Sequence, residues 1–467
     1  MRDNPFLETD RAIVGDGYTS FEALDNLTIL CDDFGSRFGG TEGEKQAADF
    51  MAEKLEHYGL QNVHLEPFDY LGWRRGPAEL EVLEPVQRTL ACISLPHSPA
   101  GEVKAELFDA GDGAPVTFEE GSSGMAGKIV MASSETFPAG SKSWVHRSEK
   151  FGRSLLNSAR AFIFMNHYPA YGPATGGVGR GGRAAPIPAI SVSNEDGSFL
   201  RRLLKRHGAV TLRIKTTDVN EPMVSWNVIG DLPGSEHPQE LVMLGSHYDG
   251  HDISQGAQDP ASGAAAVLEA ARLLAAHASP LPCTLRFALW GVEEIGLFGS
   301  KAYVDAHSDE LDEIRFYLNM DGAGAVTNKG LVINEWGALE TLAKTWQRGI
   351  AYPFEIGQSV NAHSDHYPFL LRGIPTGGIE SVPSSTSGRG YGHTRHDTLD
   401  KVELRELQDA AVLASLLAIR LASVPPERWP VTRRSPEEVG ALLDRPEYRE
   451  TAEVQRKISA FYKSQAE

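Results

Sequence analysis

The chain contains little cysteine. Its 467 residues include three, Cys31, Cys92 and Cys283, which lie far apart and form no Cys-x-x-Cys pair. A disulfide framework needs an even set of cysteines at regular spacings, and a thiolate zinc site needs paired ones. The sequence therefore argues against both, and a metal site in this chain would have to use other side chains.

Long hydrophobic segments are also missing. The first residues, MRDNPFLETDRAIVGDG, lack the apolar core of a signal peptide. The longest apolar run, residues 410–419, is too short to cross a bilayer and is followed by Arg420. We therefore expect a cytoplasmic protein with no membrane partner; a signal trimmed from the chain would leave no trace in this sequence.

Positive charge is scarce. Lys and Arg total 44 against 63 Asp and Glu, which gives a net charge of −19. Nucleic acids and anionic membranes bind basic surfaces, so this balance argues against nucleic acid as a partner. The remaining composition, 41% hydrophobic and 23% charged, is ordinary for a globular protein. Nothing in it indicates an oligomeric state.

Changes in the pattern of apolar runs and of glycine-rich loops along the sequence predict four parts. Residues 1–75 begin a main domain, and residues 76–217 form an inserted β-rich domain of short strand-like runs such as GKIVMAS and RAFIFMN. Residues 218–425 complete the main domain, and residues 426–467 form a peripheral helical tail. The glycine-rich stretch ATGGVGRGGRAAP (174–186) follows no strand and opens no helix, so we expect a flexible loop there and not a phosphate-binding loop.

The main domain has an α/β pattern. ELVMLGS, CTLRFALW and IRFYLNM are continuous apolar runs typical of buried strands, and SGAAAVLEAARLLAAH between the first two is typical of a buried helix. Strands that alternate with helices predict a mixed, mostly parallel central sheet flanked by helices on both faces.

Metal-binding side chains follow each of these strands. His247 ends the first, Glu293 and Glu294 follow the second, and Asp321 follows the third. Taken singly, each is commonplace as a surface histidine, a solvated pair or a helix cap. Ligands in open α/β sheets lie beyond the carboxyl ends of the strands, so these residues are expected to meet at one edge. Nitrogen and carboxylate ligands suit zinc, and the excess of carboxylates predicts two metal ions that share one of them.

Five motifs together resemble one known family. GSHYDGHDISQGAQDPASG, WGVEEIGLFGS, NMDGAG, SDHYPFLLRGIP and YGHTRHDTLD are similar, in order and spacing, to motifs of the co-catalytic dizinc exopeptidases of clan MH. That family includes bacterial leucyl aminopeptidase, aminopeptidase Y and plasma glutamate carboxypeptidase. The stretch GSRFGGTEGEKQAADFMAEKL also fits, and residues 76–217 resemble the protease-associated domain that several members insert. The resemblance covers most of the chain except its tail.

The resemblance implies a role for each of seven residues. His247 and Asp321 would bind one metal ion, Glu294 and His393 would bind the other, and Asp259 would bridge the two. The remaining two roles are a general base, Glu293, and a residue that orients the imidazole of His247, Asp249. The implied cofactor is two Zn²⁺, with Co²⁺ or Mn²⁺ as substitutes.

Some positions in these motifs need separate treatment. The family phrase selects His393 as the ligand, with Asp397 as its companion, and we interpret His251, His366 and His396 as residues without a metal. Many members carry a tyrosine directly before the ligand histidine, whereas this chain has Gly392 there, so the resemblance does not identify the oxyanion donor. Members also hold a cis peptide bond after the bridging aspartate. Since Pro260 follows Asp259, and a cis bond costs least before proline, we predict it here too.

The function implied is hydrolysis of a peptide bond at a chain end in a peptide or small amide. We expect an aminopeptidase. Three alternatives stay open: a carboxypeptidase or dipeptidase of the same family, a one-zinc acyltransferase like glutaminyl cyclase, and a receptor-like relative without catalysis. Metal stoichiometry and the release of free amino acids would separate them.

Overall fold

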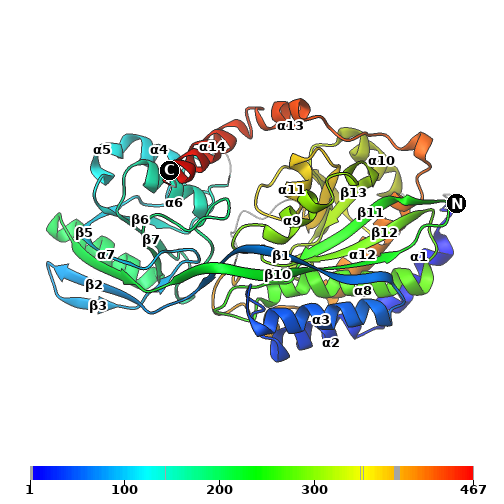
Figure 1. Cartoon of the computed structure of the whole chain (residues 1–467), viewed down its shortest axis with the longest axis horizontal. Helices are drawn as coiled ribbons and strands as arrows, with labels where there is room; N and C mark the ends of the chain where they lie inside the picture. Colours follow the sequence, from blue (N-terminus) through cyan, green and yellow to red (C-terminus); the bar gives the residue numbers. More distant parts are fainter. Residues whose placement is uncertain (1–3, 142–143, 348, 351, 383–389, 466–467) are drawn as a thin grey trace.

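The structure is a computed structural model, and it describes residues 4–141, 144–347, 349–350, 352–382 and 390–465. Figure 1 shows two lobes, joined below by a pair of long strands and above by the C-terminal segment. Each lobe is built around an eight-stranded sheet. No helix in the described ranges has the length and apolar character needed to span a membrane.

The main lobe contains the first sheet. Its strands, in spatial order, are β1 (Gln61–Arg74), β10 (Val219–Leu232), β12 (Cys283–Trp290), β11 (His237–His247), β13 (Ile314–Asn319), β16 (Thr376–Ser381), β14 (Lys329–Ile333) and β15 (Glu355–Gln358). The central strands β12, β11, β13 and β16 are parallel, while β10 and β14 pair antiparallel to their ends of this set. The predicted mixed sheet with a parallel centre is confirmed.

Helices cover both faces of this sheet. They are α1 (Leu7–Gly17), α2 (Glu22–Thr28), α3 (Glu42–His57), α8 (Ser262–His277), α9 (Phe298–Ala306), α10 (Gly337–Gln347), α11 (His366–Leu371) and α12 (Leu404–Ala422). Side chains alternate along a strand, so Val242 and Leu244 of β11 join the core under α8 and α12, whereas Met243 joins the core under α9 and α11. Burial on both faces explains why the central strands are continuously apolar.

The inserted lobe, which we define as residues 78–216, contains the second sheet. Its strands, in spatial order, are β3 (Arg88–Leu90), β2 (Ala78–Glu84), β9 (Thr211–Thr216), β5 (Gly101–Asp109), β6 (Ile129–Ser133), β7 (Ala161–Met165), β8 (Ala189–Val192) and β4 (Ile93–Ser94). The lobe also holds α4 (Pro115–Glu120), α5 (Ser122–Met125), α6 (Arg147–Leu156) and α7 (Asn194–His207). It is therefore less purely β than the sequence suggested.

The C-terminal tail is helical and packs against other parts of the chain. It contains α13 (Pro436–Leu443) and α14 (Arg449–Ser464). Figure 1 shows the tail crossing from the main lobe to α6 of the inserted lobe. Val454, Ile458 and Tyr462 of α14 are buried in the same core as Phe151 and Phe162 of that lobe. The tail therefore connects the two lobes.

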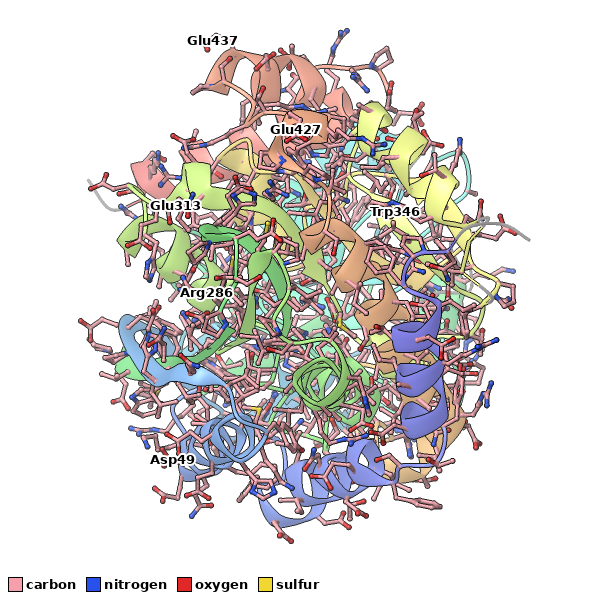
Figure 2. All side chains as sticks on the ribbon, turned by 90° about the vertical axis from the view of Figure 1, so that its right-hand side faces the viewer. Asp49, Arg286, Glu313, Trp346, Glu427 and Glu437 are labelled. Atoms are coloured by element: carbon pink, nitrogen blue, oxygen red, sulfur yellow. The ribbon has the colours of Figure 1, made fainter. Side chains whose placement is uncertain are left out.

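The negative charge lies on the outside of the molecule. Figure 2 views the end formed by the main lobe, where Asp49, Glu313, Glu427 and Glu437 project outward. All four are exposed. Such a surface favours solubility and has no need of a basic partner.

Candidate metal centre

Three strands end at the same edge of the main sheet. His247 is opposite Trp290 in the β11–β12 pair, and Gly245 is opposite Asn319 in the β11–β13 pair. The segments that leave β11, β12 and β13 therefore start side by side. They place His247, the Glu293–Glu294 pair and Asp321 at one edge, as the strand-end argument predicted.

The loop between His247 and Asp259 is held from beneath by Arg37. This side chain is fully buried, and its guanidinium donates to the carbonyls of Leu30, Tyr248 and Gly256 at 2.8, 2.8 and 3.1 Å. Gly250 and Gly256 cross so closely that a β-carbon on Gly250 would lie 3.1 Å from the Gly256 Cα. Glycine is thus required for the path that returns the chain to the strand edge.

One group of ligand atoms surrounds His247. Its Nε2 lies 3.2 Å from Asp321 Oδ1 and 3.5 Å from Asp259 Oδ1. These three residues offer ligand atoms that all lie within 4.8 Å of one another. Ser364 donates its hydroxyl to the other oxygen of Asp321 at 2.7 Å, which fixes the carboxylate. We call this group the His247 triad.

A second group surrounds Glu294. Its Oε2 lies 2.9 Å from His251 Nε2 and 3.1 Å from His393 Nε2, and the ligand atoms of the three again lie within 4.8 Å of one another. His251 is 2% exposed. The sequence analysis interpreted His251 as a residue without a metal, whereas its position beside Glu294 and His393 makes it a further candidate ligand. We call this group the Glu294 triad, and neither His366 nor His396 belongs to it.

Asp259 connects the two triads. One carboxylate oxygen lies 3.5 Å from His247 Nε2 and the other 3.3 Å from His393 Nε2. Its backbone N–H donates to Asp397 at 3.2 Å, so Asp397 supports Asp259. The bond between Asp259 and Pro260 is cis, which confirms that prediction.

Asp249 organises the remaining predicted residues. Its carboxylate accepts the backbone N–H of Glu293 at 2.8 Å and that of Glu294 at 3.3 Å. The Nδ1 of His247 lies 3.5 Å from the same carboxylate and 3.1 Å from the Asp249 carbonyl oxygen, to which it can donate. Asp249 thus holds the turn that presents Glu293 and Glu294, and its backbone orients His247 so that Nε2 faces the triad.

The electrostatics of the centre fit bound cations. Burial raises the pKa of Glu293 well above its usual value. Burial opposes protonation of His247, but the charges of Glu293 and Asp321 outweigh it and raise the pKa of that imidazole. In Glu294 burial is outweighed instead by His251 and His393, which lower the pKa of the carboxyl.

These shifts describe buried carboxylates that need a positive partner. Imidazole nitrogens and carboxylate oxygens, grouped in two triads around a shared aspartate, are the donor set of paired zinc ions. The residues present therefore fit two Zn²⁺, one at each triad.

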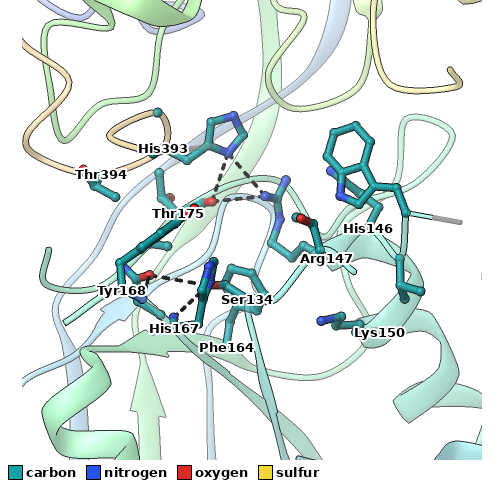
Figure 3. A pocket seen from close by; sticks show the side chains of 17 residues that line it. Ser134, His146, Arg147, Lys150, Phe164, His167, Tyr168, Thr175, His393 and Thr394 are labelled. Atoms are coloured by element: carbon teal, nitrogen blue, oxygen red, sulfur yellow. Dashed lines mark hydrogen bonds between the residues drawn. The ribbon is translucent and has the colours of Figure 1, made fainter. Parts of the chain in front are cut away.

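A cavity opens beside His393, between the two lobes. Figure 3 shows Arg147, His146, His167 and Lys150 of the inserted lobe lining it, together with Thr394 of the main lobe. No Asp or Glu lines the cavity in the described part of the chain. A cavity next to a metal ligand is the natural place for part of a substrate.

The inserted lobe also touches the centre directly through Thr175. The Nδ1 of His393 lies 3.2 Å from the Thr175 carbonyl oxygen, and the Thr175 N–H donates to the His393 carbonyl at 2.8 Å (Figure 3). The sequence predicted only a flexible loop here. A contact made by the main chain does not depend on the side-chain type, and the neighbouring Gly176–Gly177 pair was the one available signal of close approach.

Tyr391 does not replace the tyrosine that the family carries at position 392. Its ring stacks on Tyr171 of the inserted lobe, with the ring centres 4.9 Å apart. The ammonium of Lys401 lies 5.1 Å from the centre of the Tyr391 ring. Tyr391 therefore joins the wall between the lobes.

Comparison with known proteins shows which family and which relatives this chain is similar to. Residues 227–418 match the family model described as Peptidase family M28. Carboxypeptidase Q of Xenopus laevis is 28% identical over 311 residues, which is 65% of this chain and 66% of that protein. Leucine aminopeptidase 2 of Trichophyton equinum is 29% identical over 359 residues, 73% of this chain and 68% of that protein.

Solved structures show the same fold. A Peptidase M28 precursor from Shewanella amazonensis has a TM-score of 0.76 at 23% identity, covering 92% of this chain and 98% of that one. BSAP, a zinc aminopeptidase from Bacillus subtilis, has a TM-score of 0.67 at 23% identity, covering 88% and 97%. The resemblance found in the five motifs is thereby confirmed: residues 227–418 match Peptidase family M28, and the fold over most of the chain is that of a solved M28 peptidase.

Proposed function

We propose that this chain is a two-zinc aminopeptidase that removes residues from the free amino end of peptides. The observation that carries the two-metal part is the position of Asp259 between the triads, 3.5 Å from His247 and 3.3 Å from His393. In this proposal His247, Asp321 and Asp259 hold one ion. Glu294, His393 and Asp259 hold the other, with His251 as an additional nitrogen donor.

The chemistry follows from the positions of the side chains. Bound zinc lowers the pKa of a water molecule and polarises the scissile carbonyl. Glu293 is next in sequence to a ligand, and its backbone is fixed by Asp249, so its carboxylate is positioned to accept a proton from that water and donate it to the leaving amine. Burial raises the pKa of Glu293, which suits a group that must both accept and return a proton.

Preference for the amino end is supported by Glu380. This half-buried carboxylate lies on β16, the neighbour of β13 in the sheet, and it has no Lys or Arg partner among the described residues. Burial and the charge of Asp321 raise its pKa to about 7. An ammonium group of the substrate would complement the Glu380 carboxylate. The relatives named leucine aminopeptidase 2 point to the same activity.

A second candidate, a carboxypeptidase or dipeptidase, is favoured by the cavity beside His393. Arg147 lines it, and no Asp or Glu among the described residues does. The guanidinium of Arg147 is held by the carbonyls of Thr175 and Gly177 at 3.1 and 3.2 Å, so its charge has a fixed position. A substrate carboxylate would be attracted to that position. The relatives named carboxypeptidase Q are consistent with this activity.

The other two alternatives receive less support. A glutaminyl-cyclase-like enzyme needs a single zinc ion, whereas this chain offers two complete triads. A receptor-like relative would have lost ligands, yet all five predicted ligand positions lie together in the main lobe.

The deciding experiment uses one tripeptide in three forms: Leu-Gly-Gly, its N-acetyl derivative and its C-terminal amide. The products are identified by mass spectrometry. An aminopeptidase releases leucine from the free peptide and from the amide but not from the acetylated form. Release of C-terminal glycine, stopped by amidation, would instead establish the carboxypeptidase.

A further inference from the structure

The last helix, α14, packs into the inserted lobe as part of its core. Val454, Ile458 and Tyr462 are 6, 2 and 4% exposed. Gly152 of α6 lies so close that a β-carbon there would be 2.2 Å from Ile458 Cδ1. The two helices are therefore in tight contact, and α14 cannot shift without moving α6.

The preceding helix, α13, is fixed to the main lobe. Val439 and Leu442 pack with Leu370 of α11 in one buried cluster. Just before α13, the Arg434 N–H donates to the Gly373 carbonyl at 2.8 Å. The tail is thus attached to both lobes, by α13 on one side and by α14 on the other (Figure 1).

Polar groups of α14 hold one particular segment of the inserted lobe. The guanidinium of Arg180 donates to Ser459 Oγ at 2.7 Å and to the side chain and carbonyl of Gln455. The hydroxyl of Tyr462 donates to the Val178 carbonyl. We call residues 175–180 the contact segment, because its other end reaches the metal centre.

The end of the contact segment near Thr175 contacts His393 and Glu294, the two members of the Glu294 triad that were predicted as ligands. Thr175 exchanges two contacts with His393, at 2.8 and 3.2 Å. A β-carbon at Gly177 would lie 3.4 Å from the Glu294 carbonyl oxygen. When a histidine binds a metal through Nε2, a carbonyl at Nδ1 fixes its tautomer and orientation and makes it a better ligand.

We propose that α14 is a positioning element for the metal centre: through the contact segment it keeps the Thr175 carbonyl against His393 and so strengthens metal binding at the Glu294 triad. In the His247 triad, by contrast, the described partner of the His247 Nδ1 is the Asp249 carbonyl of the main lobe. The inference rests on the proposed two-zinc centre, but it concerns metal affinity and not the choice of substrate.

The test measures zinc affinity without any peptide. Competition with a chelator resolves two dissociation constants, and an Asp321→Asn variant identifies the one that belongs to the His247 triad. Arg180→Gln loses the guanidinium bonds to α14. It is expected to raise the zinc dissociation constant of the Glu294 triad about tenfold and to change that of the His247 triad by less than about twofold. Arg180→Lys keeps one donor and recovers part of the loss. The matched control is Lys457→Ala, on the exposed side of α14 at 62% side-chain exposure.

A second variant removes α14 by ending the chain after Leu443. It is expected to raise the zinc dissociation constant of the Glu294 triad at least as much as Arg180→Gln does. If circular dichroism shows that this shortened chain is unfolded, Arg180→Gln and Tyr462→Phe decide the matter. Two unchanged constants, or two that fall equally, would overturn the proposal. Since no substrate is present, a chain that proved not to be an aminopeptidase could still pass this test.

Discussion

In both lobes, functional side chains follow the carboxyl ends of parallel strands, but the types of side chain differ. In the main lobe, parallel strands lead to His247, Glu294 and Asp321, which are members of the two triads that can hold cations. In the inserted lobe, the parallel strands β6 and β7 are followed by Ser134 and His167, which line the cavity beside His393. Strand order brings side chains to one edge in both lobes, but the residue types alone decide whether that edge holds a metal or forms a wall.

The two lobes also differ in which groups they contribute to the centre: the predicted ligands and base in one, and groups that position them or line the cavity in the other. All the predicted ligands and the predicted base lie in the main lobe. The inserted lobe contributes the Thr175 carbonyl and the cationic side of the cavity. Substitutions in the main lobe should therefore change the reaction rate or metal content, whereas those in the inserted lobe should change affinities.

The largest effect is expected at Glu293. A Glu293→Gln variant keeps the shape of the side chain but cannot accept a proton, so kcat should fall by about 10²–10⁴-fold. Since Glu293 belongs to neither triad, the variant should still bind two zinc ions per chain. Steady-state kinetics and elemental analysis of the dialysed protein measure the two quantities.

The matched control for Glu293 is its neighbour. Glu294→Gln should lose one zinc ion per chain, because it removes a charged member of the Glu294 triad. If Glu293→Gln lost zinc instead, or kept the wild-type kcat, the roles of the two neighbours would have to be reassigned.

A smaller effect is expected at Arg147 of the inserted lobe. Removing a charge-assisted hydrogen bond to a substrate carboxylate costs about tenfold or more in affinity. At saturating zinc, which offsets any loss of metal from a centre that Arg147 approaches to 3.3 Å at His393 Nδ1, Arg147→Gln should therefore raise KM for peptides with a free C-terminal carboxylate about tenfold more than KM for the matching amides. The measurement compares Leu-Gly-Gly with its amide in both proteins. Equal effects on the two peptides would show that Arg147 does not bind a carboxylate.

The sequence predicted the parts of the centre that depend on residue type and strand order. His247, Glu294 and Asp321 follow apolar strands whose alternation with helices implies a parallel sheet, so their meeting at one edge could be derived. Asp259 and His393 sit in loops, and only the family resemblance identified them. Their positions depend on long-range contacts such as those made by Arg37 and Asp397.

The sequence could not predict contacts that lack a residue signature. Thr175 acts through its main-chain carbonyl, and any residue type has one. His251 joins Glu294 because the loop folds back over Arg37, which no local spacing encodes. The helical tail was predicted from its pattern, but the apolar stripe of α14 does not say which lobe it packs against.

The smallest effect concerns the stability of the main lobe and involves Glu44, at the start of α3. This buried carboxylate accepts the Gly40 N–H at 2.6 Å and the Ser225 hydroxyl. Burial raises its pKa to about 8 in the folded protein, from an ordinary value of 4.5. A carboxyl whose pKa is raised by folding stabilises the protein fully below its unfolded pKa, and that contribution is lost as the pH rises through the folded pKa.

A Glu44→Gln variant should therefore respond less to pH than the wild-type protein. Glutamine stays neutral and still offers an oxygen to Gly40 and Ser225, so stability should be similar near pH 5. Between pH 6 and pH 8 the wild-type protein should lose about 2 kcal/mol more than the variant. Urea unfolding at each pH, with zinc present, measures this difference. Because Glu44 lies outside both triads, zinc content should be equal in the two proteins, and parallel stability curves would show that the carboxyl ionises normally in the folded state.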